Sequence, residues 1–412
     1  MRDSSEHSID IRFSVPFVHR LRVTDDVSRA DFPELLKVLD GGDSGKPKVL
    51  VVSERALSSA AERIAKRLTA AGTVQLIDQP LLVQGGEDIK NSSVVVESIL
   101  SQINAANLDR RSYIVAIGGG AMLDAVGYAA AIAHRGIRLV RLPTTTLAQG
   151  DSGVGVKNAI NFFDKKNWIG TFAVPWAVIN DTALLETLPD RDFQSGFSEA
   201  VKVSLLKDRQ EFNWLCRNAD AIRRREVPAC KRAIHQSCML HLKHITEGGD
   251  PFEMLEARPL DFGHWSAHRL EPLTDYQIRH GEAVAIGVAI DTIYSSIKFG
   301  FPDDDMWKVC CCLRQLGMQL WHQGLNPMDR LMKGLEEFRQ HLGGRLTITM
   351  LREVGDPINV HEIDRVAMTA SINQLRDMQT ELNLLPMDDV PTGVRLTPSD
   401  SSQDVDSRQP SG

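Results

Sequence analysis

Three histidines and one glutamate are the residues whose types and spacing best suit metal chemistry. His264, His268 and His280 stand in HWSAHRLEPLTDYQIRH, a stretch that is otherwise apolar or helix-forming. Imidazole is the commonest nitrogen ligand for a transition metal, and histidines four residues apart project from one face of a helix. Two imidazoles and the carboxylate of Glu199, in GFSEAVK, would hold Zn²⁺ and leave a position open for substrate. The histidine pair is equally compatible with a polar helix face or a capped core pair.

A glycine-rich turn separates a predicted strand from a predicted helix. Gly118, Gly119 and Gly120 follow the run SYIVAI, and Asp124 lies one turn into the helix. The backbone of such a turn can approach a phosphate closely, and the helix N-terminus favours its negative charge. The triplet is not a full GxGxxG, so alone it is a weak signal. Upstream, Glu87 and Lys90 fit contacts to a ribose or nicotinamide, or an exposed ion pair at helical spacing.

The densest polar segment is LPTTTLAQGDSGVGVKNAINFFDKKNWIGTF, which begins at Leu142. It carries acidic, basic and amide side chains among glycines: Asp151, Lys157, Asn158, Asn161, Lys165, Lys166 and Asn167. This composition is typical of an exposed loop. It also fits a cleft that binds a polyhydroxylated or phosphorylated molecule.

Alternating strand and helix patterns dominate the first part of the chain. We expect strands over residues 9–23, 49–52, 74–79, 112–120 and 137–146, with helices over 56–72, 92–107 and 121–136. Strands interleaved with helices predict a parallel sheet covered on both faces. From about residue 184 the pattern changes to long amphipathic segments.

The predicted organisation is therefore an α/β domain followed by a mostly helical one. We assign residues 1–183 to an α/β NAD-binding domain and residues 184–385 to an α-helical metal- and substrate-binding domain. Residues 386–412 are rich in Pro, Ser, Asp and Gly, and we interpret them as a disordered tail.

Composition excludes several classes of function. The formal net charge of −7 argues against a nucleic-acid partner. The N-terminus MRDSSEHSIDIRF lacks the apolar core of a signal peptide, and no apolar run approaches the roughly eighteen residues of a membrane span. The six cysteines form no CxxC pair, which is typical of reduced thiols. We expect a cytoplasmic protein that does not span a membrane.

Seven motifs resemble the sugar phosphate cyclases of the 3-dehydroquinate synthase superfamily. They occur in the family's order and spacing between about Val49 and about Asp364: GGGAMLDAVGYAAAIAHRG, LPTTTLAQGDSGVGVKNAIN, KKNWIGTF, INDTALLETLP, SEAVK, LDFGHWSAHRLE and HGEAVAIG. The resemblance implies a dehydroquinate synthase-like fold, a small-molecule sugar phosphate substrate and a homodimer.

The resemblance also implies roles for individual residues. The zinc ligands would be Glu199, His264 and His280, which makes His268 a neighbour of the substrate. Catalytic groups would be Asp151, Lys157, Lys202 and His268, to which we add Asp261, a departure from the family pattern. Substrate contacts would come from Arg135, Lys166, Asn167 and Lys243. NAD would be bound by Glu54, where the family has an aspartate, and by Glu87, Lys90, Gly119, Gly120, Asp124, Thr144, Thr145 and Thr182.

The family chemistry accounts for these groups. NAD⁺ transiently oxidises an alcohol, phosphate is eliminated, the ketone is reduced again, and an intramolecular aldol addition closes a carbocycle. Zn²⁺, with Co²⁺ as a substitute, acts as a Lewis acid, and lysines neutralise the phosphate. NAD is regenerated in each turnover.

Departures from the family pattern indicate the substrate. Where 3-dehydroquinate synthases hold a carboxylate with an arginine and an asparagine, this chain has Ala257 and Asp261, although Arg258 is adjacent. An aspartate repels a carboxylate and accepts hydrogen bonds from a hydroxymethyl group. Trp265 replaces the family's Thr or Ser, and Arg339 or His341 would replace a C-terminal phosphate-binding lysine.

These departures are similar to those of the sedoheptulose 7-phosphate cyclases. Formation of 2-epi-5-epi-valiolone is our first interpretation; 2-epi-valiolone, desmethyl-4-deoxygadusol and 3-dehydroquinate follow. An iron-type polyol dehydrogenase and a non-catalytic metal-binding protein are the alternatives from other classes.

Overall fold

The chain forms two compact units that meet between Leu188 and Pro189 in the sequence. The computed structural model describes residues 9–41, 45–163, 165–255, 258–341, 344–385, 387 and 390, apart from the side chain of His341. The division comes slightly later than the predicted boundary after residue 183. The predicted tail lies outside the described residues except for Met387 and Val390, and Ala257 also lies outside them.

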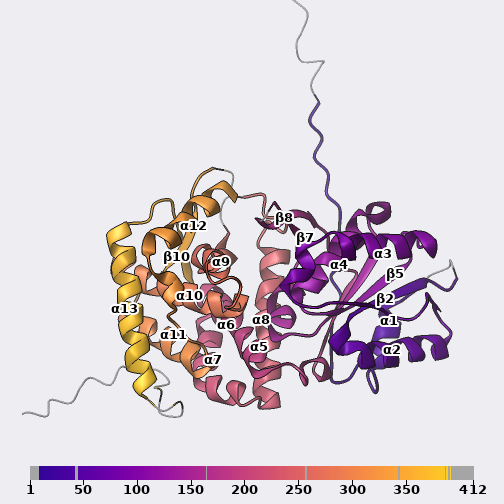
Figure 1. Cartoon of the computed structure of the whole chain (residues 1–412), viewed down its shortest axis with the longest axis horizontal. Coiled ribbons are helices and arrows are strands. Elements are labelled where there is room, and N and C mark those ends of the chain that lie inside the picture. The colour runs from indigo at the N-terminus through magenta and orange to yellow at the C-terminus, as the bar shows by residue number, and fades with distance from the viewer. Residues whose placement is uncertain are drawn as a thin grey trace, which may run out of the picture. The chain divides into compact units, whose positions relative to one another are not determined.

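The first unit is built on a parallel seven-stranded sheet of order β1-β9-β6-β5-β2-β3, with β4 also paired to β2 (Figure 1). Its strands are β1 (Leu21–Thr24), β2 (Lys48–Glu54), β3 (Gln75–Leu76), β4 (Leu81–Val83), β5 (Tyr113–Gly118), β6 (Arg138–Pro143) and β9 (Ala177–Asp181). Its helices are α1 (Phe32–Val38), α2 (Ser58–Ala71), α3 (Val94–Ala105) and α4 (Gly120–Ile132). A separate antiparallel hairpin consists of β7 (Lys157–Phe162) and β8 (Lys165–Phe172).

Alternate side chains of each central strand supply two hydrophobic cores. Val49 and Val51 of β2 pack with α1 and α2 on one face, whereas Leu50 and Val52 pack with α3 and α4 on the other. A strand buried on both faces needs a continuous apolar run, which is the pattern that predicted β2, β5 and β6. The predicted parallel sheet is confirmed.

The prediction of one strand over residues 9–23 is wrong for most of its length. Only Leu21–Thr24 form β1, and residues 9–20 are neither helix nor strand. The strand predicted over 74–79 is likewise reduced to Gln75–Leu76. Strands need backbone partners, and an apolar pattern does not reveal whether one is within reach.

The second unit is mostly helical, as predicted. Its helices are α5 (Asp190–Ser195), α6 (Phe197–Lys207), α7 (Arg209–Arg223), α8 (Val227–Glu247), α9 (His264–Leu273), α10 (His280–Phe299), α11 (Asp303–Gln315), α12 (Met328–His341) and α13 (Arg365–Leu384). A hairpin of β10 (Ile348–Glu353) and β11 (Asp356–Val360) packs beside them. In the described part of the chain, no helix is both long and apolar enough for a bilayer crossing.

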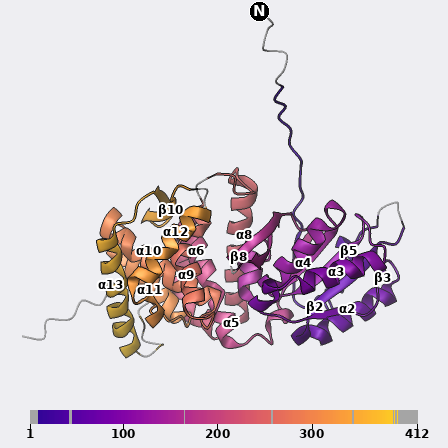
Figure 2. The ribbon, with the colours of Figure 1, turned by 45° about the horizontal axis from the view of Figure 1, so that its top comes forward.

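Helix α10 is the centre of this unit. It is buried along most of its length and contacts α6, α9, α11 and α13 (Figure 2). Two glycines bring α9 close to it: a Cβ on Gly263 would lie 2.6 Å from Val288 N, and one on Gly287 would lie 1.9 Å from Gly263 O. Gly263 also has a φ of +77°, which favours glycine. The fold therefore fixes where His264, the next residue, begins α9.

Candidate active site

The three predicted metal ligands stand in the first turns of three helices of the second unit. Glu199 is the third residue of α6, His264 begins α9 and His280 begins α10. Glu199 and His264 are buried and His280 is half-buried. Helix packing, rather than a loop, therefore sets the positions of all three side chains.

Their distances suit a small divalent cation. Oε1 of Glu199 lies 3.4 Å from Nε2 of His264 and 3.7 Å from Nε2 of His280. Ligand atoms at tetrahedral corners about 2.0–2.2 Å from Zn²⁺ are separated by about 3.3–3.6 Å. Within the described residues, Oε1 of Glu199 has no hydrogen-bond partner although it is buried. An orphaned carboxylate oxygen facing two imidazole nitrogens is a donor set that fits Zn²⁺.

The other ring nitrogen of each histidine is already engaged. Nδ1 of His264 lies 3.1 Å from the carbonyl oxygen of Phe262, and Nδ1 of His280 lies 3.1 Å from Oε2 of Glu271. Such contacts place the proton on Nδ1 and leave Nε2 as the ligand. Glu271 is buried, and nothing in the sequence pattern singled it out.

A lysine completes the buried charge balance. Nζ of Lys202 lies 2.5 Å from Oε2 of Glu199, and both side chains are almost fully buried. Burial alone would raise the pKa of the Glu199 carboxyl, but the Lys202 charge and the His264 imidazole hold it well below its usual value. Glu199 is therefore ionised, as a metal ligand must be.

His268 is the exposed member of the histidine group. Its ring centroid lies 5.3 Å from that of His264 and 5.8 Å from that of His280. A side chain that borders the centre and faces solvent can contact a substrate. Together with Glu271 and His280 it forms a second possible donor set, but the Glu271 contact to His280 has hydrogen-bond length, which favours an orienting role for Glu271.

A buried aspartate braces the residues on either side of His264. Asp291 of α10 is fully buried, and its carboxylate accepts hydrogen bonds of 2.9 Å from the backbone N–H of Gly263 and from Nε1 of Trp265. Burial raises the pKa of Asp291 to about 7 despite these two donors. A lone acidic residue in the apolar run AVAIGVAID was a signal that could have identified it.

The predicted cofactor residues lie together in the first unit. Glu54, Gly118, Thr144 and Thr182 are at or directly after the carboxyl ends of β2, β5, β6 and β9. This edge of an open parallel sheet is where such folds bind ligands. Oε1 of Glu54 accepts a 2.8 Å hydrogen bond from Gly119 N, yet burial outweighs it and raises the pKa of Glu54. Gly119 is the N-cap residue of α4 and Gly120 begins the helix, whose N-terminus suits a pyrophosphate.

A buried lysine links this edge to the polar hairpin. Nζ of Lys90 lies 2.7 Å from Oδ2 of Asp124 and also donates to Oδ1 of Asn167. Lys166 and Glu87 form a longer ion pair of 3.8 Å. Predicted cofactor residues and predicted substrate residues therefore share one network.

Arg141 organises the segment that carries Asp151 and Lys157. It lies in β6 and is fully buried, and its guanidinium donates to the carbonyl oxygens of Gly153, Gly155 and Lys157 and to Oδ1 of Asn158. Sequence analysis missed it because one arginine in LVRLP is also typical of a solvent-facing position. Burial lowers its pKa only to about 10, so it stays charged.

One predicted substrate residue, Arg135, is not brought to the glycine turn. Arg135 follows α4 and precedes β6, so it lies at the amino edge of the sheet, a helix of about 20 Å away from the glycine turn. Lys243 lies on an exposed position of α8. Arg339 is held by Glu336 and by the carbonyl oxygen of Gly344, whereas the side chain of His341 lies outside the described residues.

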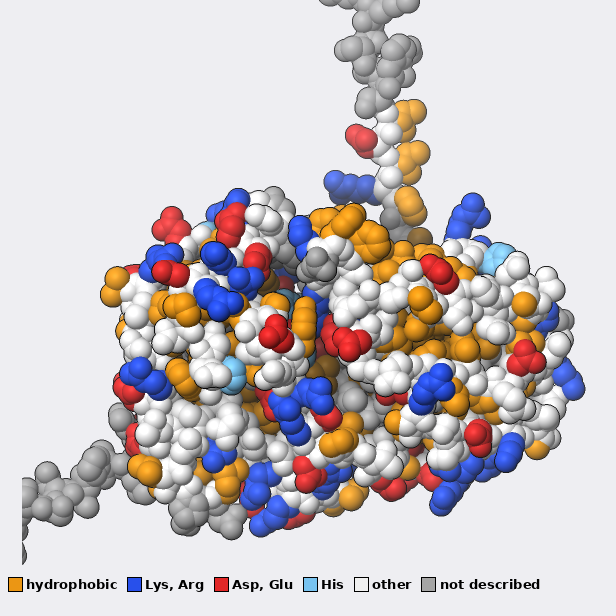
Figure 3. All heavy atoms as spheres, in the orientation of Figure 1, with side chains coloured by type: hydrophobic (Ala, Val, Ile, Leu, Met, Phe, Trp, Pro, Cys, Tyr) orange, Lys and Arg blue, Asp and Glu red, His pale blue; other side chains and the backbone are white. Residues whose placement is uncertain are grey.

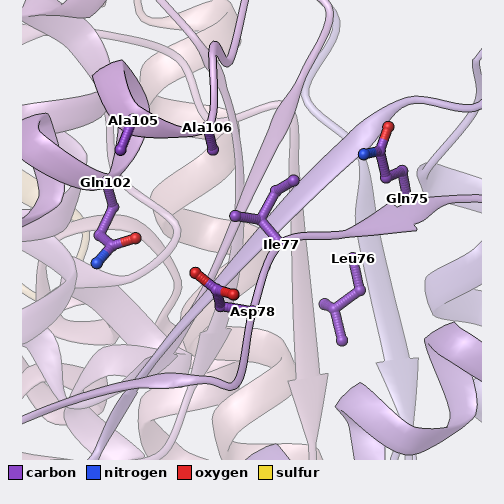
Figure 4. A pocket seen from close by; sticks show the side chains of 7 residues that line it. All are labelled: Gln75, Leu76, Ile77, Asp78, Gln102, Ala105 and Ala106. Atoms are coloured by element: carbon purple, nitrogen blue, oxygen red, sulfur yellow. The ribbon is translucent and has the colours of Figure 1, made fainter.

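A surface hollow of about 370 Å³ in the first unit is separate from the cofactor edge. It lies between β3 and α3 and is lined by Gln75, Leu76, Ile77, Asp78, Gln102, Ala105 and Ala106 (Figure 4). Because β3 pairs with the first residues of β2, the hollow is at the end of that strand opposite Glu54. It does not contribute to the candidate site.

Comparison with known proteins gives matches along most of the chain. The family models "3-dehydroquinate synthase N-terminal" and "3-dehydroquinate synthase C-terminal" match residues 80–195 and 196–338. A 2-epi-valiolone synthase from Actinosynnema mirum is 30% identical over 373 residues, which are 89% of this chain and 94% of the relative. A 3-dehydroquinate synthase from Halorhodospira halophila is 32% identical over 336 residues, 80% of this chain and 93% of the relative.

A solved structure shares the fold. ValA, a 2-epi-5-epi-valiolone synthase from Streptomyces hygroscopicus subsp. jinggangensis 5008 with NAD⁺ and Zn²⁺ bound, superposes with a TM-score of 0.80 at 24% identity, and the match covers 90% of this chain and all of that one. The family models and the relatives together identify the protein as a sugar phosphate cyclase of the 3-dehydroquinate synthase superfamily.

Proposed function

We propose that the protein converts sedoheptulose 7-phosphate to a C7 cyclitol, 2-epi-5-epi-valiolone or a stereoisomer of it, with release of phosphate. It would work with NAD and with Zn²⁺, for which Co²⁺ can substitute, as a cytoplasmic homodimer. The relative with 30% identity carries the name of a C7 cyclitol synthase, which supports this substrate class.

Asp261 is the observation that carries the choice of substrate. It ends a short 3-10 helix, Pro259–Asp261, that packs against α6 and stands three residues before His264. A hydrogen bond of 3.2 Å from Thr349 Oγ1 to the carbonyl oxygen of Arg258 ties the same segment to β10. A carboxylate three residues before a predicted metal ligand, on a segment tied to α6 and β10, would repel a carboxylate on a substrate and accept hydrogen bonds from a neutral hydroxymethyl end.

The two bound groups supply the reactivity that amino acids lack: NAD⁺ takes up and returns a hydride, and Zn²⁺ polarises the oxygen on the reacting carbon. Glu199, His264 and His280 would hold the zinc. Glu54, Lys90, Asp124 and the Gly119–Gly120 turn would hold the nucleotide. No net oxidation results, because one sugar phosphate gives one cyclitol and one phosphate.

The remaining residues bind the sugar phosphate and move its protons. Lys157 and Lys166 lie on the hairpin and Lys202 beside Glu199, and their ammonium groups would neutralise the phosphate as it leaves. His268, which is exposed beside the metal ligands, would exchange a proton with a substrate hydroxyl. Asp151 would accept hydrogen bonds from the other hydroxyls, and the side-chain amide of Asn167 would donate hydrogen bonds to them.

The proposal is tested by comparing the rates of phosphate release from two sugar phosphates, one of which carries a carboxylate where the other carries a hydroxymethyl group. Purified protein should release phosphate from sedoheptulose 7-phosphate at least about tenfold faster than from 3-deoxy-arabino-heptulosonate 7-phosphate, which carries a carboxylate. Asp261→Asn removes the repulsion, so it should narrow this ratio, whereas Asp303→Asn on the surface should not. An equal or faster rate with the carboxylate substrate would contradict the proposal.

Formation of 3-dehydroquinate is the second candidate. It is favoured by the 3-dehydroquinate synthase from Halorhodospira halophila, at 32% identity. The same substrate comparison distinguishes the two.

A further inference from the structure

The N-terminal arm, residues 9–18, is the most exposed apolar segment of the described chain. Ile9, Ile11 and Phe13 are 81%, 78% and 87% exposed, and Val15 and Phe17 are each 59% exposed. Monomeric proteins rarely leave a contiguous apolar surface of this kind in water, and such surfaces mark binding sites.

The arm has the pattern of a β-strand with one apolar side. Every odd position from Ile9 to Phe17 is apolar, and the even positions between them are Asp10, Arg12, Ser14 and Pro16. Figure 3 shows hydrophobic side chains along one side of the extended arm and charged ones on the other. A period of two in an extended backbone is what a strand needs to bury one face.

Pro16 restricts how this strand can pair. Proline has no N–H, so it is accepted only where its backbone points away from a neighbouring strand. Alternate residues of a strand point their N–H and C=O groups to opposite sides. The odd residues of the arm must therefore make the backbone hydrogen bonds, and the arm can have a neighbour on one edge only.

The root of the arm is fixed on the first unit. Nε2 of His19 lies 2.9 Å from the carbonyl oxygen of Val154, and Leu21 begins β1, which pairs with β9. Val154 stands in the segment that leads into β7. The arm therefore leaves the unit close to the β7–β8 hairpin, yet it extends away from its own unit (Figure 2).

Strand β8 offers a matching edge. In the described chain it pairs with β7 alone. The bond from Ala173 N to Val156 O fixes the alternation, so the backbone groups of Trp168 and Gly170 point away from β7. Phe162, Phe163, Trp168 and Phe172 of the hairpin are between 44% and 73% exposed.

We propose that the arm of one copy adds as a strand along β8 of a second copy, and that the second copy returns the same contact. The proposal rests on the homodimer of the proposed function and names its surface. Residues 9–17 and the eight residues of β8 have similar lengths of about 30 Å. A reciprocal exchange closes under two-fold symmetry.

The buried area is that of a stable dimer. Five apolar side chains on the arm and four aromatic ones on the hairpin, at about 100 Å² each, cover roughly 900 Å² per copy. Specific interfaces bury about 800 Å² per partner. Main-chain hydrogen bonds along β8 add directionality, as in other cases of strand addition.

Cross-linking between two distinguishable copies tests the exchange. One copy carries Phe13→Cys, the other carries Trp168→Cys, and each has a different affinity tag. The six native cysteines are buried, and burial raises the pKa of Cys230 to about 11 and of Cys311 to about 12, so a short bismaleimide should react with the new thiols only. We expect a covalent dimer that carries both tags.

Three outcomes would overturn the proposal. Cross-linking of Phe13→Cys with itself would show that two arms pair with each other. A link formed within one diluted chain that carries both substitutions would show that the arm folds back on its own hairpin. A single species of monomer mass at micromolar concentration would exclude exchange altogether.

A matched pair of charge substitutions measures the strength of the contact. Phe13→Asp should raise the dimer dissociation constant at least about a hundredfold, whereas Val366→Asp, on α13 and 81% exposed, should change it less than twofold. An equal effect of both, or of neither, would contradict the proposal. Phosphate release from sedoheptulose 7-phosphate is measured separately, so a cross-linked but inactive dimer would contradict the proposed function and not the exchange.

Discussion

The cluster of predicted metal ligands and the β7–β8 hairpin hold the predicted catalytic groups in opposite ways. Glu199 and His264 are buried at the first turns of packed helices. Lys157 and Asn167 are exposed on a two-stranded hairpin. The side chains of the cluster are thus held in place before a ligand binds. The exposed side chains of the hairpin can still change conformation when a ligand binds.

This difference predicts different responses to substitution. In the cluster, loss of one group leaves buried charge or buried nitrogen without compensation, which is expensive. On the hairpin, loss of one group removes one contact among several. A substitution in the cluster should therefore abolish most of the activity, whereas a substitution around the hairpin should reduce activity only in part.

The largest effect should come from His280→Ala. Two remaining ligands cannot hold Zn²⁺ tightly, so metal content after dialysis, measured by mass spectrometry, should fall to the background level. Activity should fall by more than the roughly 10–100-fold that loss of an outer-shell partner causes.

His268→Ala is the control for His280→Ala. It should keep its metal while losing activity, because His268 faces the substrate in our assignment. Full metal content in His280→Ala, or loss of metal in His268→Ala, would reverse the assignment of the two histidines.

A smaller effect on the same centre should follow removal of Glu271. Its carboxylate holds Nδ1 of His280, so Glu271→Ala should weaken metal affinity by about 10–100-fold, and Glu271→Gln, which can still accept the hydrogen bond, should recover part of it. Chelator competition measures both. Glu381→Ala, on the exposed side of α13, should have no effect; equal affinity in all three variants would refute the orienting role.

Graded behaviour should appear at Arg141. Arg141→Met leaves its buried acceptors without donors, which costs about 1–3 kcal/mol in the free energy of unfolding and should raise KM for the sugar phosphate several-fold. Urea unfolding and steady-state kinetics measure the two quantities.

Arg138→Gln is the matched change for Arg141→Met. Arg138 begins β6 and packs on Tyr113 and Trp176, on the face of the sheet opposite to the one against which the hairpin packs. It should lower stability without changing KM. An unchanged KM in Arg141→Met, or an equal change in KM in Arg138→Gln, would contradict a specific role of Arg141 in substrate binding.

The smallest expected effect concerns Asp291. Its titration should change the stability of the protein with pH and should have little effect on activity. Its pKa is raised to about 7 from an ordinary 3.8, so the folded carboxyl keeps its proton where the unfolded one has lost it. Stability should therefore fall as pH rises from about 4 to 7, by at most about 1.4 kcal/mol per pH unit, and level off above 7. The measurement is the midpoint of urea unfolding between pH 5 and 8, which should decline in the unsubstituted protein and not in Asp291→Asn. The same pH dependence of the midpoint in both proteins would show that Asp291 does not titrate in this range.

The sequence predicted the buried strands and the glycine turn of the first unit, because these depend on residues close together in the chain. The buried runs of β2, β5 and β6 and the glycine turn before α4 were found from apolar periods and turn chemistry. The β7–β8 hairpin was not found, because its strands are polar and are held by Arg141 from a different strand. The arm was taken as part of a strand that the single chain does not form.

The candidate site divides in the same way. Residue types and spacing raised the three histidines and Glu199, and the family resemblance selected His280 in place of His268 as a ligand. Glu271 and Asp291 escaped because each acts through a neighbour, His280 or Trp265, that only the packing of α9 on α10 reveals. A residue whose role is to hold another leaves little trace in one sequence.

The central claim is that this chain cyclises a neutral seven-carbon sugar phosphate without net oxidation. NMR of the reaction with sedoheptulose 7-phosphate, together with phosphate release and absorbance of NADH, tests it directly. We predict one C7 cyclitol and one phosphate per sugar consumed, with no accumulation of NADH. Accumulation of NADH, or an unchanged sugar phosphate beside an active reaction with the carboxylate substrate, would contradict it.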